Sequence, residues 1–156
     1  MVPHRFRAGF VPAMAVLSFG FAATAPAPAS AATGSQIVGT AWRYLGRPYW
    51  YGVPYYLTPR WFDCSAFTKY VYARNGIYLP RSSREQARSG WWVSGWNLRV
   101  GDLCFFSLYP GGPISHVAIN MGGSRLIHTY GAGGVRISDW NRYWSARFKM
   151  ARRIVR

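Results

Sequence analysis

The spacing of the hydrophobic residues changes near Trp91, and this change constrains the fold more than any other feature of the chain. Before Trp91, apolar side chains recur at helical spacing within residues 35–45 and again after Asp63. Because helices precede strands instead of alternating with them, we predict an α+β fold in which N-terminal helices pack on an antiparallel β-sheet. The expected strands, which are short and separated by glycine-rich turns, are residues 103–106, 116–121, 125–130 and 135–137.

Local signals predict where two of the helices begin. Asp63 can cap the first turn of a helix that ends before Asn75-Gly76, and this cap places Cys64 at the helix N-terminus. Farther along, Ser82 is followed three residues later by Glu85, which is the spacing of a capping box. We therefore expect a second, short helix after Ser82.

The first thirty residues have the layout of a secretory signal peptide. Two arginines precede an uncharged apolar stretch over residues 8–25, and a small-x-small cleavage site ends at Ala31. We predict that residues 1–31 are removed near Ala31 and that residues 32–156 form one domain. An uncleaved N-terminal anchor is the alternative. After cleavage we expect no stable membrane span, and a location that is secreted, periplasmic or in the cell wall.

The chain is strongly basic, with a formal net charge of +15 that falls by two when the N-terminal Arg5 and Arg7 are removed. An exported basic protein has three natural anionic partners, namely nucleic acid, membrane head groups and cell-wall polymers. The arginines form no basic stripe and no nucleic-acid motif, so we expect anionic cell-wall polymers and no nucleic acid. Scattered arginines that merely solvate the surface remain an alternative.

Two cysteines lie in different surroundings. In an exported chain they could form a disulfide, because oxidising compartments favour one. Cys104 lies inside the apolar run Leu103-Cys104-Phe105-Phe106 and suits the core, whereas Cys64 lies at the predicted helix start. A helix N-terminus and a nearby imidazolium lower a thiol pKa, so we predict that Cys64 is a nucleophile.

Two histidines can serve such a cysteine, since His4 leaves with the signal peptide. His116 and His128 flank the turn Gly122-Gly123-Ser124. If this turn closes a hairpin, His116 opposes Tyr130, and His128 becomes its diagonal neighbour on the same face. A register slip of one residue would put the histidines on opposite faces. We predict that His116 is the base and that His128 orients it.

Four short blocks of the sequence together carry a family signal. They are Asp63-Cys64-Ser65-Ala66-Phe67, Leu79-Pro80-Arg81-Ser82-Ser83 with Gln86, Gly101-Asp102-Leu103-Cys104-Phe105-Phe106, and His116-Val117-Ala118-Ile119. In this order and spacing the blocks resemble the NlpC-type cell-wall cysteine peptidases. The resemblance covers nearly all of residues 36–153, and His128 matches the third polar position of the family. Alanine at position 66, where the family has glycine, and an unusually aromatic loop over residues 54–61 depart from its pattern.

The resemblance implies a minimal papain-like domain that cuts the peptidoglycan stem peptide, commonly between γ-D-glutamate and a diamino acid. It also implies that Tyr49 helps the Cys64 backbone N–H to stabilise an oxyanion, for which Tyr51 is a competing candidate and aromatic packing another interpretation. The mechanism needs no cofactor. No Cys-x-x-Cys or His-Glu-x-x-His spacing predicts a metal site.

Further substrate contacts are expected from residues around the nucleophile. Asp63 and Ser65 flank Cys64, and Arg81 or Arg60 could orient a substrate carboxylate. Three alternatives to a stem-peptide endopeptidase stay open: an amidase of the related CHAP type, an acyltransferase that uses the same Cys–His pair, and a wall-binding module without activity. The complete set of Cys64, His116 and His128 argues against the last, because adhesion needs none of them.

Overall fold

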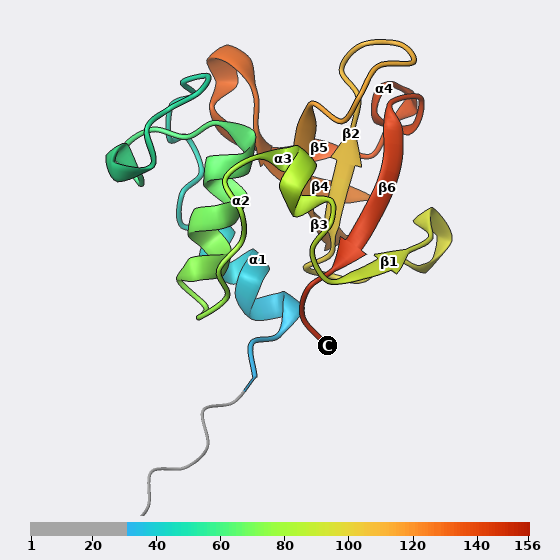
Figure 1. The fold of residues 1–156 in the computed structure, drawn as a ribbon, viewed down its shortest axis with the longest axis horizontal. Helices are drawn as coiled ribbons and strands as arrows, with labels where there is room; N and C mark the ends of the chain where they lie inside the picture. Colours follow the sequence, from blue (N-terminus) through green and yellow to red (C-terminus); the bar gives the residue numbers. More distant parts are fainter. Residues whose placement is uncertain (1–30) are drawn as a thin grey trace, which may run out of the picture.

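The computed structural model describes residues 31–156, and Figure 1 shows the N-terminal helices on one side of a single sheet. The predicted signal peptide, apart from Ala31, lies outside the described residues. The helices and 3-10 helices are α1 (Gly34–Trp42), η1 (Tyr55–Leu57), α2 (Cys64–Ala73), α3 (Ser83–Gln86), η2 (Gly95–Asn97), η3 (Gly131–Gly133) and α4 (Arg142–Ser145). The strands are β1 (Trp91–Val93), β2 (Leu103–Phe106), β3 (His116–Gly122), β4 (Arg125–Thr129), β5 (Val135–Asp139) and β6 (Phe148–Arg153).

The helices begin where polar side chains can accept their first N–H groups. Thr33 caps α1 in a capping box with Gln36, and Asp63 caps α2 by accepting a hydrogen bond from the backbone N–H of Ala66 at 2.8 Å. The expected capping box of Ser82 and Glu85 starts α3. The predicted helix starts at Cys64 and after Ser82 are thus confirmed.

The sheet is antiparallel with the strand order β1-β6-β2-β3-β4-β5. The predicted fold class is therefore confirmed. The C-terminal strand β6 inserts between β1 and β2, and neither β1 nor β6 was among the four expected strands. Helix α4, which leads into β6, was also not predicted.

Hydrophobic residues pack on both faces of the sheet. On one face, α1 and α2 contribute Ile37, Ala41 and Phe67 to the larger cluster, which includes Val117 and Ile127 of the sheet. The smaller cluster lies on the other face, and its buried members are Val93, Cys104, Phe106, Ala118, Leu126, Trp144 and Ala151. Cys104 is fully buried there, as its apolar surroundings predicted.

The hairpin of β3 and β4 has the predicted register, which places His116 and His128 on the same face of the sheet. Ile119 opposes Ile127, so continuing the ladder places His116 opposite Tyr130. The turn differs from the prediction, because Gly122 pairs with Arg125 and a bulge separates Asn120 from Gly122. The bulge absorbs the extra residue near the turn, so the register farther along the strands is unchanged.

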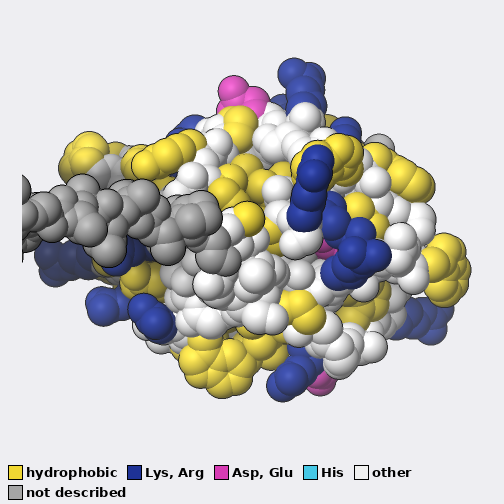
Figure 2. All heavy atoms as spheres, turned by 90° about the horizontal axis from the view of Figure 1, so that it is seen from below, with side chains coloured by type: hydrophobic (Ala, Val, Ile, Leu, Met, Phe, Trp, Pro, Cys, Tyr) yellow, Lys and Arg dark blue, Asp and Glu magenta, His cyan; other side chains and the backbone are white. Residues whose placement is uncertain are grey.

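Positive charge is scattered over the surface. Figure 2 shows Lys and Arg side chains among exposed hydrophobic ones, with few acidic side chains on this face. Among residues 31–156, no helix has the length and hydropathy of a membrane span.

The two cysteines belong to different layers, which leads to a prediction about their oxidation state. Cys64 begins α2, whereas Cys104 lies in the cluster on the opposite face of the sheet, and both thiols are free. Thiol titration of the denatured, unreduced protein should give the same count as titration after reduction. A count near zero before reduction would show that the cysteines are paired and would remove Cys64 as nucleophile.

Candidate active site

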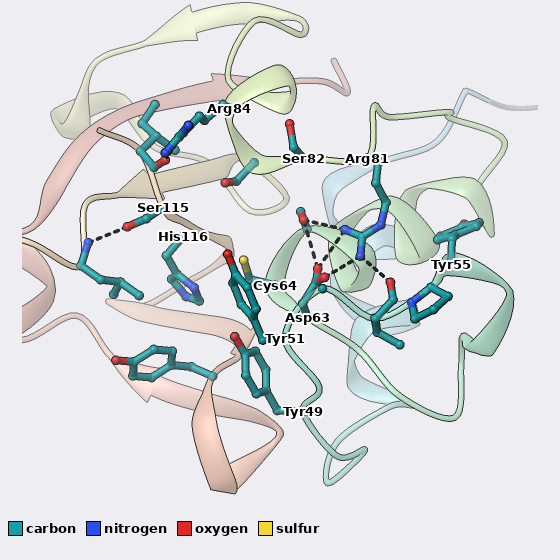
Figure 3. Close-up of a pocket in the computed structure, with 18 of the residues that line it drawn as sticks. Tyr49, Tyr51, Tyr55, Asp63, Cys64, Arg81, Ser82, Arg84, Ser115 and His116 are labelled. Carbon is teal, nitrogen blue, oxygen red and sulfur yellow. Dashed lines mark hydrogen bonds and ion pairs between the residues drawn. The ribbon is translucent and has the colours of Figure 1, made fainter. Parts of the chain in front are cut away.

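A cavity of about 1060 Å³ opens where α2 begins and β3 begins. Cys64 and His116 both line it, and Figure 3 shows the histidine on the sheet side and the cysteine on the helix side. The loop before α2 adds Tyr49 and Tyr51, and the segment around α3 adds Arg81 and Arg84. The site therefore lies where the first residues of α2 and β3 meet, and loops form the rest of its wall.

Cys64 is the first residue of α2, and the cap determines its surroundings. The Asp63 carboxylate accepts the N–H of Ala66, while the N–H groups at the very start of a helix have no carbonyl partner within it. The Cys64 N–H is one of these groups. It is therefore available to a negative charge that develops beside the sulfur.

Asp63 and Arg81 form a salt bridge beside the nucleophile. Arg81 Nη1 donates to Asp63 Oδ1 at 3.0 Å and to Ser65 Oγ at 2.9 Å, while Nη2 donates to the other carboxylate oxygen and to the carbonyl of Val53 at 2.6 Å. Four acceptors thus hold the guanidinium. Arg81 lines the cavity, but most of its donors are already used.

Gln86 links α3 to the start of α2. Its side-chain Nε2 donates to the carbonyls of Ser65 and Pro80, both at 2.9 Å, and its Oε1 accepts from Thr68 Oγ1 at 2.6 Å. Gln86 is fully buried, so these contacts satisfy an amide that would otherwise destabilise the core. The presence of Gln86 in the second of the four sequence blocks therefore has a structural explanation.

The two histidines are joined to each other and to a serine. His116 Nε2 lies 3.0 Å from His128 Nδ1, and His128 Nε2 lies 2.9 Å from Ser138 Oγ on β5. A neutral imidazole has one N–H and one lone-pair nitrogen. When Ser138 accepts from His128 Nε2–H, His128 Nδ1 accepts from His116 Nε2–H. This assignment leaves the lone pair of His116 Nδ1 free for a thiol proton.

Aromatic rings enclose this chain of imidazoles. Trp144 of α4 stacks on His116 at 5.3 Å between ring centroids and meets His128 edge-on at 4.9 Å. Phe106 closes a further side, at 6.2 Å from His116. Both histidines are almost completely buried as a result.

Burial favours the neutral forms of the nucleophile and of both histidines. It raises the pKa of the Cys64 thiol to about 11, with a further increase from the charge of Asp63. It lowers the pKa of His116 well below its usual value and, together with the charge of Arg136, lowers the pKa of His128 to about 3. The raised thiol pKa differs from the sequence-based expectation of a lowered one, because desolvation and the charge of Asp63 outweigh the backbone hydrogen bonds and the charge of Arg81.

The two tyrosines proposed for the oxyanion differ in their exposure. Tyr49 forms a backbone bridge with Phe62, and burial and then the neighbouring Cys64 raise its pKa to about 12. Tyr51 lines the same cavity but is 84% exposed. Tyr49 is thus the less exposed of the two tyrosines and keeps its un-ionised, donating form.

Sequence reasoning missed Ser138, Trp144 and Arg84. Ser138 lies one residue beyond the expected end of its strand, and continuing the alternation from Arg136, which opposes His128, would have placed it on the histidine face. Trp144 carried no local signal, because α4 was not predicted. Arg84 lines the cavity and donates to the carbonyl of Ile114 at 3.1 Å, whereas Arg60 is not part of the lining.

A metal site would need several ligating side chains close together. Within residues 31–156, no three His, Cys, Asp or Glu side chains group as a metal site would require.

Two curated relatives align with most of this chain. It is 40% identical over 111 residues to the murein DD-endopeptidase MepS/murein LD-carboxypeptidase of Escherichia coli K12, covering 68% of this chain and 58% of that protein. It is 38% identical over 106 residues to the γ-D-glutamyl-L-lysine dipeptidyl-peptidase of Bacillus cereus, covering 67% of this chain and 29% of that protein. The aligned part thus spans less than two thirds of either relative.

Solved structures share the fold. An NlpC/P60 family protein from Bacillus cereus superposes with a TM-score of 0.74 and 32% identity over 81% of this chain and 41% of that chain. The NlpC/p60 domain of the peptidoglycan hydrolase SagA superposes with a TM-score of 0.66 and 35% identity, over 78% of this chain and 99% of that chain.

The family model confirms the resemblance read from the four sequence blocks. The model described as the NlpC/P60 family matches residues 46–153, a segment that contains Cys64, His116 and His128. The chain therefore belongs to the NlpC/P60 family.

Proposed function

We propose that this protein is a cysteine endopeptidase of the bacterial cell wall that hydrolyses the stem peptide of peptidoglycan. The observation that carries the proposal is the cavity shared by Cys64 and His116, where the base is held by His128 at 3.0 Å. Membership in the NlpC/P60 family and relatives named as murein and γ-D-glutamyl peptidases support it. Since this substrate lies outside the cytoplasm, the proposal includes export.

The proposed reaction starts from a neutral thiol and a neutral imidazole. The Cys64 sulfur attacks the amide carbonyl while its proton passes to His116 Nδ1, so the two charges arise only as the bond forms. The Cys64 N–H and the Tyr49 hydroxyl would donate to the resulting oxyanion. His116 then gives its proton to the leaving amine as the carbon–nitrogen bond breaks.

Hydrolysis of the acyl-enzyme completes the cycle. His116 takes a proton from water, the hydroxide attacks the thioester carbonyl, and collapse of the intermediate releases the carboxylic acid. The proton returns to the sulfur. His128 and Ser138 do not touch the reacting atoms and act by keeping His116 in the tautomer whose Nδ1 accepts.

We propose the bond between γ-D-glutamate and the diamino acid as the point of cleavage. The γ linkage is unbranched on its carbonyl side, so it fits a groove between the tyrosine loop and the sheet, and one relative is named for this bond. The free α-carboxylate beside it needs a cationic partner. Arg84 suits that role better than Arg81, whose donors are engaged by Asp63, Ser65 and Val53.

A second candidate bond has its own support. The relative from Escherichia coli is named as a DD-endopeptidase, and its identity to this chain is 40%. Such an enzyme would cut the peptide cross-link between two stems instead of the stem itself. The same Cys64 chemistry would serve either bond, so the products decide between them.

Product analysis tests the proposed bond. Purified wall digested with the mature protein should release fragments that end in an alanine–glutamate dipeptide, detected by mass spectrometry, and Cys64→Ala should release none. Separated stems of full length would indicate cross-link cleavage instead. Whole stem peptides freed from the sugar chain would indicate an amidase and would contradict the proposal.

The chain from His116 to Ser138 predicts a graded response to substitution. His116→Ala should lower kcat by about 10³-fold because the proton carrier is lost. His128→Ala should lower it less, and Ser138→Ala by about fivefold, the value of one hydrogen bond. Ser89→Ala, remote from the cavity lining, serves as the matched control. Full activity of His116→Ala would disprove its assignment as base.

The depressed histidine pKa values predict activity in mild acid. Only neutral His116 can accept the thiol proton, and its protonated fraction rises as the pH falls through its folded-state pKa, which lies well below 6.5. We expect kcat/KM for a soluble stem peptide to stay level from pH 8 to 6 and to fall only at lower pH. An acid limb centred near 6.5 would show instead that His116 is hydrated during turnover.

A further inference from the structure

A second hollow lies along the edge strand β1. Its volume is about 470 Å³, and it shares no lining residue with the cavity of Cys64. Figure 1 shows β1 at the end of the sheet, beyond β6 and near the C-terminal end of the chain. The residues that line this β1 groove are Trp91, Trp92, Val93, Ser94, Asn97, Arg99, Arg153 and Arg156.

The tryptophans of the groove do not serve the core. Trp91 and Trp92 are 53% and 63% exposed, whereas Val93, the next residue of the strand, is buried and anchors β1 in the cluster with Ala151. Pairing of β1 with β6, in which Trp91 opposes Arg153 and Trp92 opposes Arg152, fixes the backbone that carries both indoles. Two large apolar rings are thus held in solvent on a rigid strand, where a docking function explains them better than packing does.

The charge of the groove is positive. Arg153 is neutralised by Asp102, which it contacts at 2.9 and 2.8 Å. Arg99 and Arg156 form no ion pair with the described residues, and the Arg156 guanidinium lies 5.2 Å from the centre of the Trp91 ring. No acidic residue lines the groove. Figure 2 shows the same mixture of basic and hydrophobic side chains over the face seen from below.

We propose that the β1 groove binds the glycan strand of peptidoglycan together with the carboxylates of its stem peptides. Indole faces stack on the apolar faces of sugar rings, and guanidinium groups bind carboxylates in a bidentate fashion. The proposal rests on the proposed function, because it assigns to the groove the polymer whose peptides the cavity would cut. Binding one part of the polymer at β1 raises the local concentration of neighbouring stems at Cys64.

Binding can be measured without digestion in a Cys64→Ala background. The probe is insoluble peptidoglycan stripped of phosphodiester-linked polymers, and the readout is co-sedimentation across a salt series. Trp91→Ala with Trp92→Ala should weaken binding about tenfold, the expected value of two stacked rings. Arg99→Gln with Arg156→Gln should weaken it and flatten its salt dependence.

Matched substitutions control for the loss of charge. Arg43→Gln with Arg74→Gln removes the same charge from exposed positions outside both cavities and should leave binding unchanged. If the tryptophan variant does not fold, comparing the groove arginine pair with the control arginine pair still tests whether the groove binds peptidoglycan. Equal binding by parent and arginine variants, or equal losses in both arginine pairs, would overturn the groove assignment.

Two other ligands of the β1 groove, a phosphodiester polymer of the wall or a nucleic acid, would give different results. Binding that disappears when phosphodiester polymers are stripped from the wall would assign the groove to those polymers and overturn the proposal. Displacement of the protein from peptidoglycan by a single-stranded oligonucleotide, lost in the tryptophan variant, would assign it to nucleic acid.

Failure of the groove is distinguishable from failure of the catalytic proposal. With Cys64 present, the groove variants should cleave a soluble alanyl-γ-D-glutamyl-diamino acid peptide at the parent rate, while their cleavage of intact wall falls. If the parent protein binds the wall but cleaves neither substrate, the catalytic proposal fails and the groove stands. Groove variants that cleave intact wall at the parent rate would show that docking at β1 does not serve the reaction.

Discussion

The salt bridge between Asp63 and Arg81 is the interaction on which the geometry of the site depends. Asp63 caps α2 and thereby fixes the residue that follows it, the proposed nucleophile Cys64. Asp63 is buried, so its charge is stable there only with the guanidinium beside it and with donors for its oxygens. Arg81 also reaches the loop at Val53, so one pair joins the helix start, the segment before α3 and the loop that walls the cavity.

The two proposed reacting residues lie in layers on opposite faces of the sheet: Cys64 begins α2, and His116 belongs to β3. Helix α2 packs on the face that carries Val117, whereas His116 alternates with Val117 and therefore points to the face covered by Trp144. The two layers can share a cavity only at the end of β3, where His116 is the first residue. This arrangement buries the base from one side and leaves the sulfur open to substrate from the other.

Features with local causes were predictable from the sequence. The Asp63 cap, the Ser82 capping box and the histidine register each depend on neighbouring residues or on one turn. The insertion of β6 between β1 and β2 depends on contacts distant in sequence, and no local pattern determines it. Trp144 was missed for the same reason, whereas Ser138 was missed because the expected strand ended one residue too early. The thiol pKa was wrong because a sequence shows a helix start but does not show how deeply it is buried.

The neutral forms of Cys64 and His116 have a consequence for the selectivity of the proposed reaction. Cys64, which is partly exposed, and the buried His116 gain little from ionising before substrate arrives, since desolvation raises the thiol pKa and lowers the imidazole pKa. Charge separation is favourable only once the oxyanion donors and a bound carbonyl share it. A neutral thiol is a weak general nucleophile, so in the proposed mechanism Cys64 reacts only with amides that the cavity positions. Positioning of the substrate is therefore the role that follows, within this proposal, for the tyrosine loop, Arg84 and the β1 groove.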